Sequence, residues 1–449
     1  MKAFIRVQPL DPIMIRDGRP FTRTPGIRAH TLKNISPSVL AGSIRTMLTK
    51  RAQASEGAFT DFKRFTKTKI RGPVYVWKDQ MYFAVPQDAQ VYENGEHLHI
   101  QPVQPQPQMS EDSGFFGTGK MGLYDNLWLP KVAVSQVAEA ESGEYKLASK
   151  QPTHVSAAYM YRWLSQPTAS FRNEYADQVK AWQDELKKST LKSEHHAFLP
   201  LFQKEERTHI ERDLLTSRAK DQQLFTTQSL VLPKDLTLQS EITLPEPEQW
   251  HGGLSELHPM GGKRRLAHFT EEHTLHEDQW NCPDEVAQAL ENQSYFRIVL
   301  ATPAYFRRGW LPSWLNEDME SNKLFGELFN TTLRVRLRWA CVPRWEAVSG
   351  WRMEKTTEKD QKDQATVQST STQPYKGEGH EKAIRRMVPV GSVYFFEVIE
   401  DAQGVKGNPA ALAKAMWLQS VSDTNRRREA FDQEDGCGLA LWGVWHPEL

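Results

Sequence analysis

The 449-residue sequence lacks several features that would place it in a familiar class of protein. Its three cysteines, Cys282, Cys341 and Cys437, are too few and too widely spaced for a disulfide framework or a zinc site, which favours a reducing compartment. No apolar run approaches the roughly 20 residues that span a bilayer. Arg6 and Asp11 interrupt the first apolar stretch, so no signal peptide is expected. We therefore expect a cytoplasmic protein that contacts no membrane.

The chain also lacks an excess of either charge, because Lys and Arg together number 56 and Asp and Glu together number 56. A free-standing nucleic-acid-binding protein is usually basic overall. The zero net charge therefore argues against a nucleic-acid-binding protein that acts alone. It weighs less against one subunit of an assembly, in which a local basic surface binds nucleic acid and acidic surfaces face elsewhere.

Signals of catalysis are scarce. The 14 histidines are scattered, no nucleophile elbow is present, and no acidic cluster resembles a two-metal site. Residues 114–120 fit the start of a phosphate-binding loop, but Met121 stands where Ser or Thr would hold magnesium. We expect no metal, no cofactor and no catalytic residue. On this segment, Phe115, Phe116 and Lys120 are candidate thumb contacts that stack on RNA bases, with a plain loop as the alternative.

The first part of the chain has the periodicity of a mixed α+β domain. Alternation over residues 2–8 predicts a strand, and Ser36 and Pro37 begin a predicted helix. Two apolar runs at 74–77 and 81–85 form a predicted hairpin, so these elements read as the first half of a ferredoxin-like βαββαβ domain. A polar insertion near 86–150 follows, and further elements are predicted as helices at 154–164 and 171–188 and strands at 206–210 and 223–231.

A second unit is expected from about residue 251, which divides the chain into domains 1–250 and 251–449. Its predicted elements are strands at 295–301, 333–339, 393–399 and 439–445 and a helix at 410–418. Residues 353–381 are nearly free of apolar side chains and are expected to form a long polar loop.

An arginine-rich segment between the first strand and the first helix is the sharpest local signal. Arg guanidinium groups match phosphate oxygens, and glycine allows a close backbone approach. The alternative is an Asp-Gly turn with solvated charges. The candidate RNA-binding residues of this region are Arg16, Gly18, Arg19, Arg23, Arg28, His30 and Arg45.

Two glycine-rich segments give further candidates. Backbone N–H groups of such loops bind phosphate while adjacent cations neutralise it. The candidate residues are Gly261, Gly262, Lys263, Arg264, Arg265, Gly436 and Gly438. Arg334, Arg336 and Arg338 share one face of a predicted strand, where salt bridges are the favoured interpretation over contact with RNA.

Residues 10–21 resemble the opening signature of a protein family, the third subunit of type III-B (Cmr) CRISPR effector complexes, which are RAMP proteins of the Cas-five group. Segments in the same order along the chain resemble the family's hairpin, glycine-pair loop, C-terminal strand and glycine-rich loop; they are 206–212 with 224–225, 259–266, 388–396 and 436–443.

This resemblance implies two ferredoxin-like (RRM-like) RAMP domains packed together, with long polar insertions. It also implies a non-catalytic, RNA-binding subunit of a ribonucleoprotein in antiviral defence. Such a subunit binds the five-prime repeat-derived tag of the CRISPR RNA beside the cyclase-domain large subunit and the backbone RAMP subunits. Two rival interpretations remain, namely a RAMP endoribonuclease that uses His30 as a general acid or base on repeat RNA, and a scaffold that contacts only protein.

Overall fold

The structure is a computed structural model, and it describes most of the chain. The described residues are 2–18, 27–56, 64–94, 97–106, 127, 129–132, 146–165, 167–188, 197–212, 215–244, 250, 252–273, 277–349, 351–353, 379–381, 384–401, 403–423 and 435–447.

The N-terminal half is built on a seven-stranded sheet, whose strands run in the order β13-β14-β1-β12-β3-β4-β9. The helix α1 (Pro37–Glu56) packs its buried Leu40, Ile44 and Met47 into a core shared with this sheet. The strands are β1 (Lys2–Pro9), β3 (Lys69–Trp77), β4 (Gln80–Ala84), β9 (His154–Ser156), β12 (Leu236–Thr243), β13 (Ser255–Pro259) and β14 (Leu266–Glu271).

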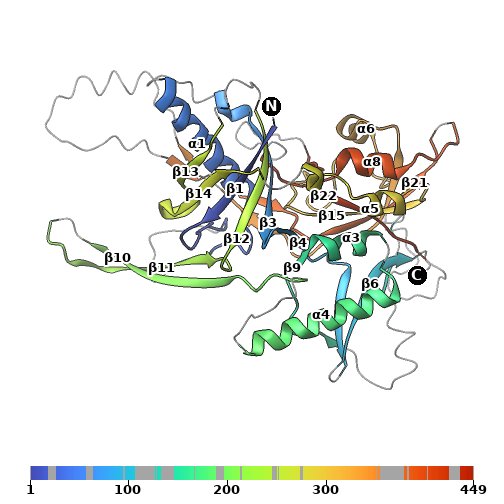
Figure 1. Cartoon of the computed structure of the whole chain (residues 1–449), viewed down its shortest axis with the longest axis horizontal. Coiled ribbons are helices and arrows are strands. Elements are labelled where there is room, and N and C mark those ends of the chain that lie inside the picture. The colour runs from blue at the N-terminus through green and yellow to red at the C-terminus, as the bar shows by residue number, and fades with distance from the viewer. Residues whose placement is uncertain are drawn as a thin grey trace.

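A long insertion separates β3 from β12, its neighbour in the sheet. It carries a second small sheet in the order β7-β6-β5-β8, two helices and the hairpin β10–β11, which projects away from the rest of the molecule (Figure 1). The elements are β5 (Ala89–Asn94), β6 (His97–Gln106), β7 (Leu129–Val132), β8 (Lys146–Leu147), α3 (Ala157–Ser165), α4 (Ala169–Lys188), β10 (Gln203–Arg212) and β11 (Ala219–Val231).

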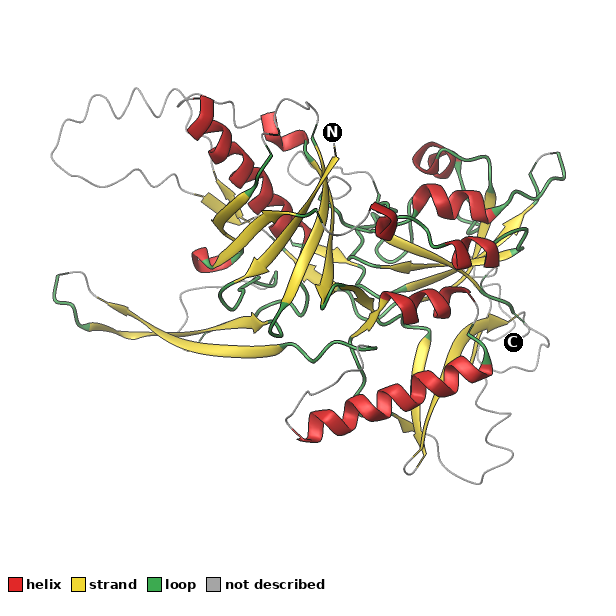
Figure 2. Cartoon of the chain, viewed as in Figure 1, coloured by secondary structure: helices red, strands yellow, loops and turns green. Residues whose placement is uncertain are grey.

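The C-terminal half has a four-stranded antiparallel sheet in the order β16-β21-β15-β22. Its elements follow one another along the chain as β15-α6-β16-β21-α8-β22, which is a βαββαβ order. Figure 2 shows its helices gathered beside the sheet. The bounds are β15 (Tyr295–Leu300), α6 (Lys323–Phe329), β16 (Arg334–Cys341), β21 (Val393–Ile399), α8 (Pro409–Met416) and β22 (Ala440–Val444).

The remaining described elements are short. They comprise β2 (Arg28–Ala29), β17 (Glu346–Val348), β18 (Trp351–Met353), β19 (Gly379–Glu381), β20 (Arg385–Met387), α5 (Asp284–Ala289) and three 3-10 turns, namely η1 (Arg64–Lys67), η4 (Gly262–Arg264) and η5 (Glu277–Trp280). No helix in the described parts of the chain is long and apolar enough to cross a membrane.

The two halves share a buried junction. The carboxylate of Asp88, in the insertion, pairs with the guanidinium of Arg297 on β15, and both side chains are 0% exposed. Asp88 also accepts a hydrogen bond from the Trp163 indole, and Arg297 donates to the Trp163 carbonyl. Helix α3 packs against β22 at Gly443, where a Cβ would lie 2.7 Å from the Leu164 carbonyl oxygen. The insertion therefore covers one face of the C-terminal sheet.

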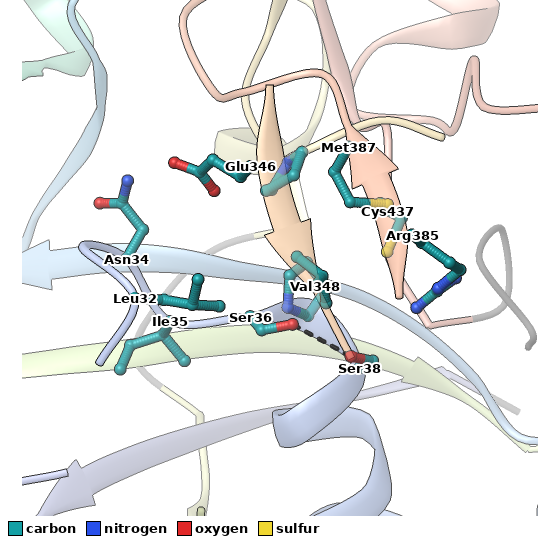
Figure 3. Close-up of a pocket in the computed structure, with 12 residues that line it drawn as sticks. Leu32, Asn34, Ile35, Ser36, Ser38, Glu346, Val348, Arg385, Met387 and Cys437 are labelled. Carbon is teal, nitrogen blue, oxygen red and sulfur yellow. Dashed lines mark hydrogen bonds between the residues drawn. The ribbon is translucent and has the colours of Figure 1, made fainter. Parts of the chain in front are cut away.

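A small pocket marks another part of this junction, where the segment before α1 meets β17 and β20 (Figure 3). Ser36 and Ser38 lie on one side, with their hydroxyls 3.0 Å apart, and Glu346 and Arg385 lie on the other. Burial raises the pKa of the Glu346 carboxyl, and Lys33 opposes this rise. The pocket draws its walls from both halves, so it belongs to their packing.

The fold confirms a mixed architecture of helices and antiparallel sheets, but not the arrangement of two ferredoxin-like domains. In the N-terminal sheet, β12 lies between β1 and β3, and β4 lies on the outer side of β3. The segment between β12 and β14 carries β13, whereas a ferredoxin-like βαββαβ order has a helix before its last strand. Since β13 and β14 extend this sheet to residue 271, the N-terminal half continues beyond the predicted boundary at residue 250.

Candidate nucleic-acid interface

The arginine-rich segment is held against the base of the β10–β11 hairpin. The Leu32 amide donates to the Ile15 carbonyl at 2.8 Å, and the Asp17 amide donates to the His30 carbonyl at 3.1 Å. Strand β2 then runs parallel to β11, with Arg28 beside Thr226. These bonds bring the segment around Arg16, Arg28 and His30 to the hairpin, while Arg19 and Arg23 lie outside the described residues.

The hairpin has two chemically different faces at its base. In the antiparallel register, Arg207 lies opposite Thr227 and His209 lies opposite Phe225. Because side chains alternate along a strand, these four project from one face, and Glu206 with Gln228 projects from the other.

Cations gather on the first of these faces. The Lys263 ammonium, from the loop between β13 and β14, lies 2.8 Å from His209 Nε2 and 5.3 Å from the centre of the Phe225 ring. The His209 and Phe225 rings stack with their centres 5.1 Å apart. We call Arg207, His209, Lys263 and Arg265 the hairpin-base cluster.

The charges of this cluster act on one another. Burial and the nearby Lys263, Arg207 and Arg265 lower the pKa of His209. Burial, Arg265 and Arg207 likewise lower the pKa of Lys263. Both shifts have the sign expected where positive charges are crowded, so this surface has a positive potential suited to an anion.

Acidic groups near the cluster are few. Arg207 donates a hydrogen bond of 2.7 Å to Glu205, and the Asp11 carboxylate accepts one of 3.1 Å from the Leu266 amide. By contrast, Arg265 Nε has no hydrogen-bond partner in the described parts of the chain. One donor of the cluster, Arg265 Nε, is therefore buried without a hydrogen-bond partner among the described residues.

The backbone next to the cluster has an uncommon conformation. Lys263 has φ 57° and Arg264 has φ 51°, values that residues other than glycine rarely adopt. Both side chains are exposed. A pair of such residues tends to occur at functional sites, where the surrounding structure maintains the strain.

The glycine pair before these cations packs against the chain after β1. The Gly262 amide donates to the Met14 carbonyl at 2.7 Å. Gly261 has φ +78°, and a Cβ there would lie 2.6 Å from the Met14 carbonyl oxygen. The glycines therefore fix the loop that carries Lys263. The Gly262 N–H was expected to donate to phosphate, but in the structure it donates to the Met14 carbonyl.

We expect the Gly261→Ala variant to lower the free energy of unfolding by about 1–3 kcal/mol, because a positive φ and a backbone clash combine at this position. Urea unfolding measures the change. Gly262→Ala is the matched control, since its Cβ would lie 3.4 Å from the same oxygen without a left-handed φ. Equal stabilities for the two variants would contradict this account.

The second face of the hairpin base carries two of the other predicted residues. Arg28 lies 3.3 Å from Glu206, which also accepts a hydrogen bond of 2.7 Å from Gln228. His30 Nδ1 lies 3.2 Å from the Gln228 side-chain oxygen. Thus Arg28 and His30 are separated by the hairpin from Lys263, and their polar groups already have partners there.

Four other predicted residues lie in the protein's own packing. Arg45 donates to Asp435 at 2.5 Å and to the Thr68 carbonyl, and the Arg45 and Asp435 side chains are 13% and 11% exposed. The buried Gly18 donates its amide to the Ala347 carbonyl at 3.0 Å. Gly436 and Gly438 are also buried, against Gly72 and Ser422 respectively. These contacts give the four residues roles within the fold, and their contact with RNA stays a prediction.

The remaining candidates divide between salt bridges and undescribed residues. Arg334 and Arg336 pair with Glu320, and Arg338 pairs with Glu397, which confirms the salt-bridge interpretation of this strand. Phe115, Phe116 and Lys120 lie outside the described residues. Within the described ranges, no three His, Cys, Asp or Glu side chains gather in a group able to hold a metal ion.

Three residues of the interface were not among the predicted site residues, namely Arg207, His209 and Phe225. Arg207 and His209 alternate with Glu206 and Thr208 in the sequence, a strand signal that places these two side chains on one face. The signal does not say that the loop with Lys263 covers that face, since Lys263 lies 54 positions after His209 along the chain.

Comparisons with known proteins identify the family. A family model described as CRISPR-associated protein (Cas_Cmr3) matches residues 5–445. No curated protein matches the sequence. A chain in the cryo-EM structure of the type III-B Cmr-beta bound to cognate target RNA and AMPPnP has 12% identity and a TM-score of 0.41, with 87% of this chain and 86% of that chain covered.

A second solved structure is less similar. A chain in the crystal structure of the Csm3-Csm4 subcomplex of the type III-A CRISPR-Cas interference complex has 10% identity and a TM-score of 0.29, with 89% of this chain and 96% of that chain covered. Both structural likenesses are weak, and the match along the sequence decides the family.

Proposed function

The chain belongs to the Cas_Cmr3 family of CRISPR-associated proteins, and from this premise we propose that it is a non-catalytic, RNA-binding subunit of a type III-B effector complex. In this proposal, it captures the five-prime repeat-derived tag of the CRISPR RNA. It docks beside the cyclase-domain large subunit and the backbone RAMP subunits, and so sets where the guide begins.

The hairpin-base cluster is the observation that carries this proposal. Three cations and a neutral imidazole lie together on a solvent-facing side of a projecting hairpin, in a chain whose overall charge is zero. Charge concentrated in this way neutralises phosphates, while base contacts supply any sequence preference. Lys263 and Arg265 would contact the backbone phosphates, and Arg207 would extend the cationic surface along the hairpin.

The geometry also bears on the choice between binding and cleavage. Cleavage of RNA by a histidine needs the imidazole within hydrogen-bond reach of a 2′-hydroxyl. His30, the residue of the nuclease alternative, is partly buried and holds Gln228. This contact supports a structural role for His30 on the opposite face from the cluster.

The test of the function is to sequence the RNA that co-purifies with a tagged full-length chain expressed from its own locus, and to identify the proteins that co-purify with it. We expect short RNAs that share one repeat-derived five-prime end, together with a cyclase-domain subunit. Absence of RNA would favour the protein-only scaffold. Unprocessed repeat transcripts that the purified chain cuts, with cutting lost in His30→Ala, would establish the nuclease instead.

A further inference from the structure

We propose that the hairpin-base cluster takes up one proton from solvent when it binds an RNA phosphate, and that His209 is the group that becomes protonated. This inference rests on the proposed function, because it requires that RNA binds at the cluster. It adds a regulation of binding by pH that no charge count of the chain predicts.

The hydrogen bonds of His209 fix its state in the free protein. Its Nε2 lies 2.8 Å from the Lys263 ammonium and 2.9 Å from the Thr227 hydroxyl. A lysine ammonium has donors and no acceptor, so Nε2 must be the accepting nitrogen. An imidazolium has no accepting nitrogen, and His209 is therefore neutral, with its proton on Nδ1.

The groups that face His209 are almost all positive or uncharged. Arg207 comes from the same strand, and Lys263 and Arg265 come from the loop between β13 and β14. Strand β11 contributes Phe225 and Thr227, which carry no charge. Two carboxylates lie near Arg207, namely Glu205, which pairs with it, and Asp11, which acts on it across a longer distance.

A phosphate bound in this cluster places a negative charge among the positive charges that surround His209. The Lys263 ammonium can turn from Nε2 to a phosphate oxygen, which leaves the Nε2 lone pair beside a new negative charge. An opposite charge at short range favours the protonated imidazole, so the pKa of His209 rises on binding. The proton bound at Nε2 is then donated to a phosphate oxygen or to Thr227 Oγ1.

The sign of the pH dependence follows from linkage. Since the complex holds more protons than the free protein, RNA affinity increases as the pH falls through the pKa of the complex. It stops increasing below the pKa of the free protein, which burial and the three cations hold under its ordinary value of 6.5. Within this window, one proton gives at most about a tenfold gain in affinity per pH unit.

The experiment measures binding of a short, fluorescently labelled single-stranded oligouridine to the full-length chain at constant ionic strength, from about pH 5.5 to about pH 8.5. We expect the wild-type affinity to rise several-fold as the pH falls. His209→Gln keeps an amide oxygen that can accept from Lys263 but cannot take up a proton, so its RNA affinity should not rise as the pH falls.

His268→Gln is the matched control. This histidine lies on β14, where its Nε2 is 2.9 Å from the Ser255 hydroxyl, and its replacement should leave the pH dependence intact. A flat wild-type profile, or a profile that persists in His209→Gln, overturns the proton uptake while RNA binding stands. Failure of the wild type to bind RNA at any pH overturns the proposed function, and this inference falls with it.

Discussion

Replacement of Lys263 and Arg265 together by glutamine is expected to weaken RNA binding about a hundredfold at low salt. Hydrogen bonds to charged groups contribute roughly 1.5–3 kcal/mol each, and about 1.4 kcal/mol corresponds to a factor of ten. Both cations act on His209, and within the described part of the chain neither forms a salt bridge with a carboxylate.

The salt dependence separates lost phosphate contacts from a general change in the protein. Each contact with a single strand contributes about 0.7 to the slope of log affinity against log salt. The double variant should therefore have a shallower slope by roughly 1.4 if both cations contact phosphates. Fluorescence anisotropy over a range of salt concentrations measures both quantities.

A control variant changes charge at a distance from the hairpin. Lys323, on α6, is well exposed and pairs with Glu327 at 3.4 Å, so Lys323→Gln removes a cation without touching the cluster. Its affinity and salt slope should equal those of the wild type. An unchanged affinity in the Lys263 and Arg265 double variant would place the RNA elsewhere on the molecule.

The second large effect is expected at the junction. Asp88→Ala should lower the free energy of unfolding by about 3–5 kcal/mol, because it leaves the Arg297 guanidinium buried without its partner charge. The Trp163 indole loses its acceptor in the same variant. Urea unfolding followed by tryptophan fluorescence measures the change.

Two comparisons sharpen this prediction. Asp184→Ala on α4 breaks an exposed pair with Lys187 and should change stability by no more than about 1 kcal/mol. The double variant Asp88→Leu with Arg297→Met removes both buried charges, and it should be more stable than Asp88→Ala. Similar losses in Asp88→Ala and Asp184→Ala would mean that the buried pair does not hold the halves together.

Local elements and the family were predictable from the sequence, because both depend on short segments. Apolar residues at helical spacing predicted α1, and Leu40, Ile44 and Met47 are buried as expected. The hairpin of β3 and β4 turns at Lys78 and Asp79, which both have positive φ. The family match over residues 5–445 confirms the resemblance first seen in residues 10–21.

The order of strands in the N-terminal sheet was not predictable in the same way. Strand β12 pairs with both β1 and β3, although more than 150 residues separate it from β3 along the chain. Alternation within a strand indicates that it has a buried face, but it does not specify which distant strand lies beside it. The sequence therefore predicted the hairpin of β3 and β4 but not that β12 lies between it and β1.

Only part of the site was predicted, again because the sequence does not show which distant segments meet. The glycine pair followed by basic residues identified Lys263 and Arg265 as candidates, and both belong to the cluster. The same reasoning selected Arg45, whose charge is paired with Asp435 inside the protein. Residue type alone does not distinguish a cation that meets solvent from one that meets a carboxylate brought from the other end of the chain.

The insertion that covers the C-terminal sheet has a consequence for the construction of chimeras from relatives of this chain. A protein joined at residue 250 would bring together Asp88 and Arg297, and Leu164 and Gly443, from different parents. Each parent's contact surfaces would have to match side chain by side chain. Exchange of the β10–β11 hairpin would have to include the loop that carries Lys263 and the segment from Ile13 to β2, because both are bonded to the hairpin base.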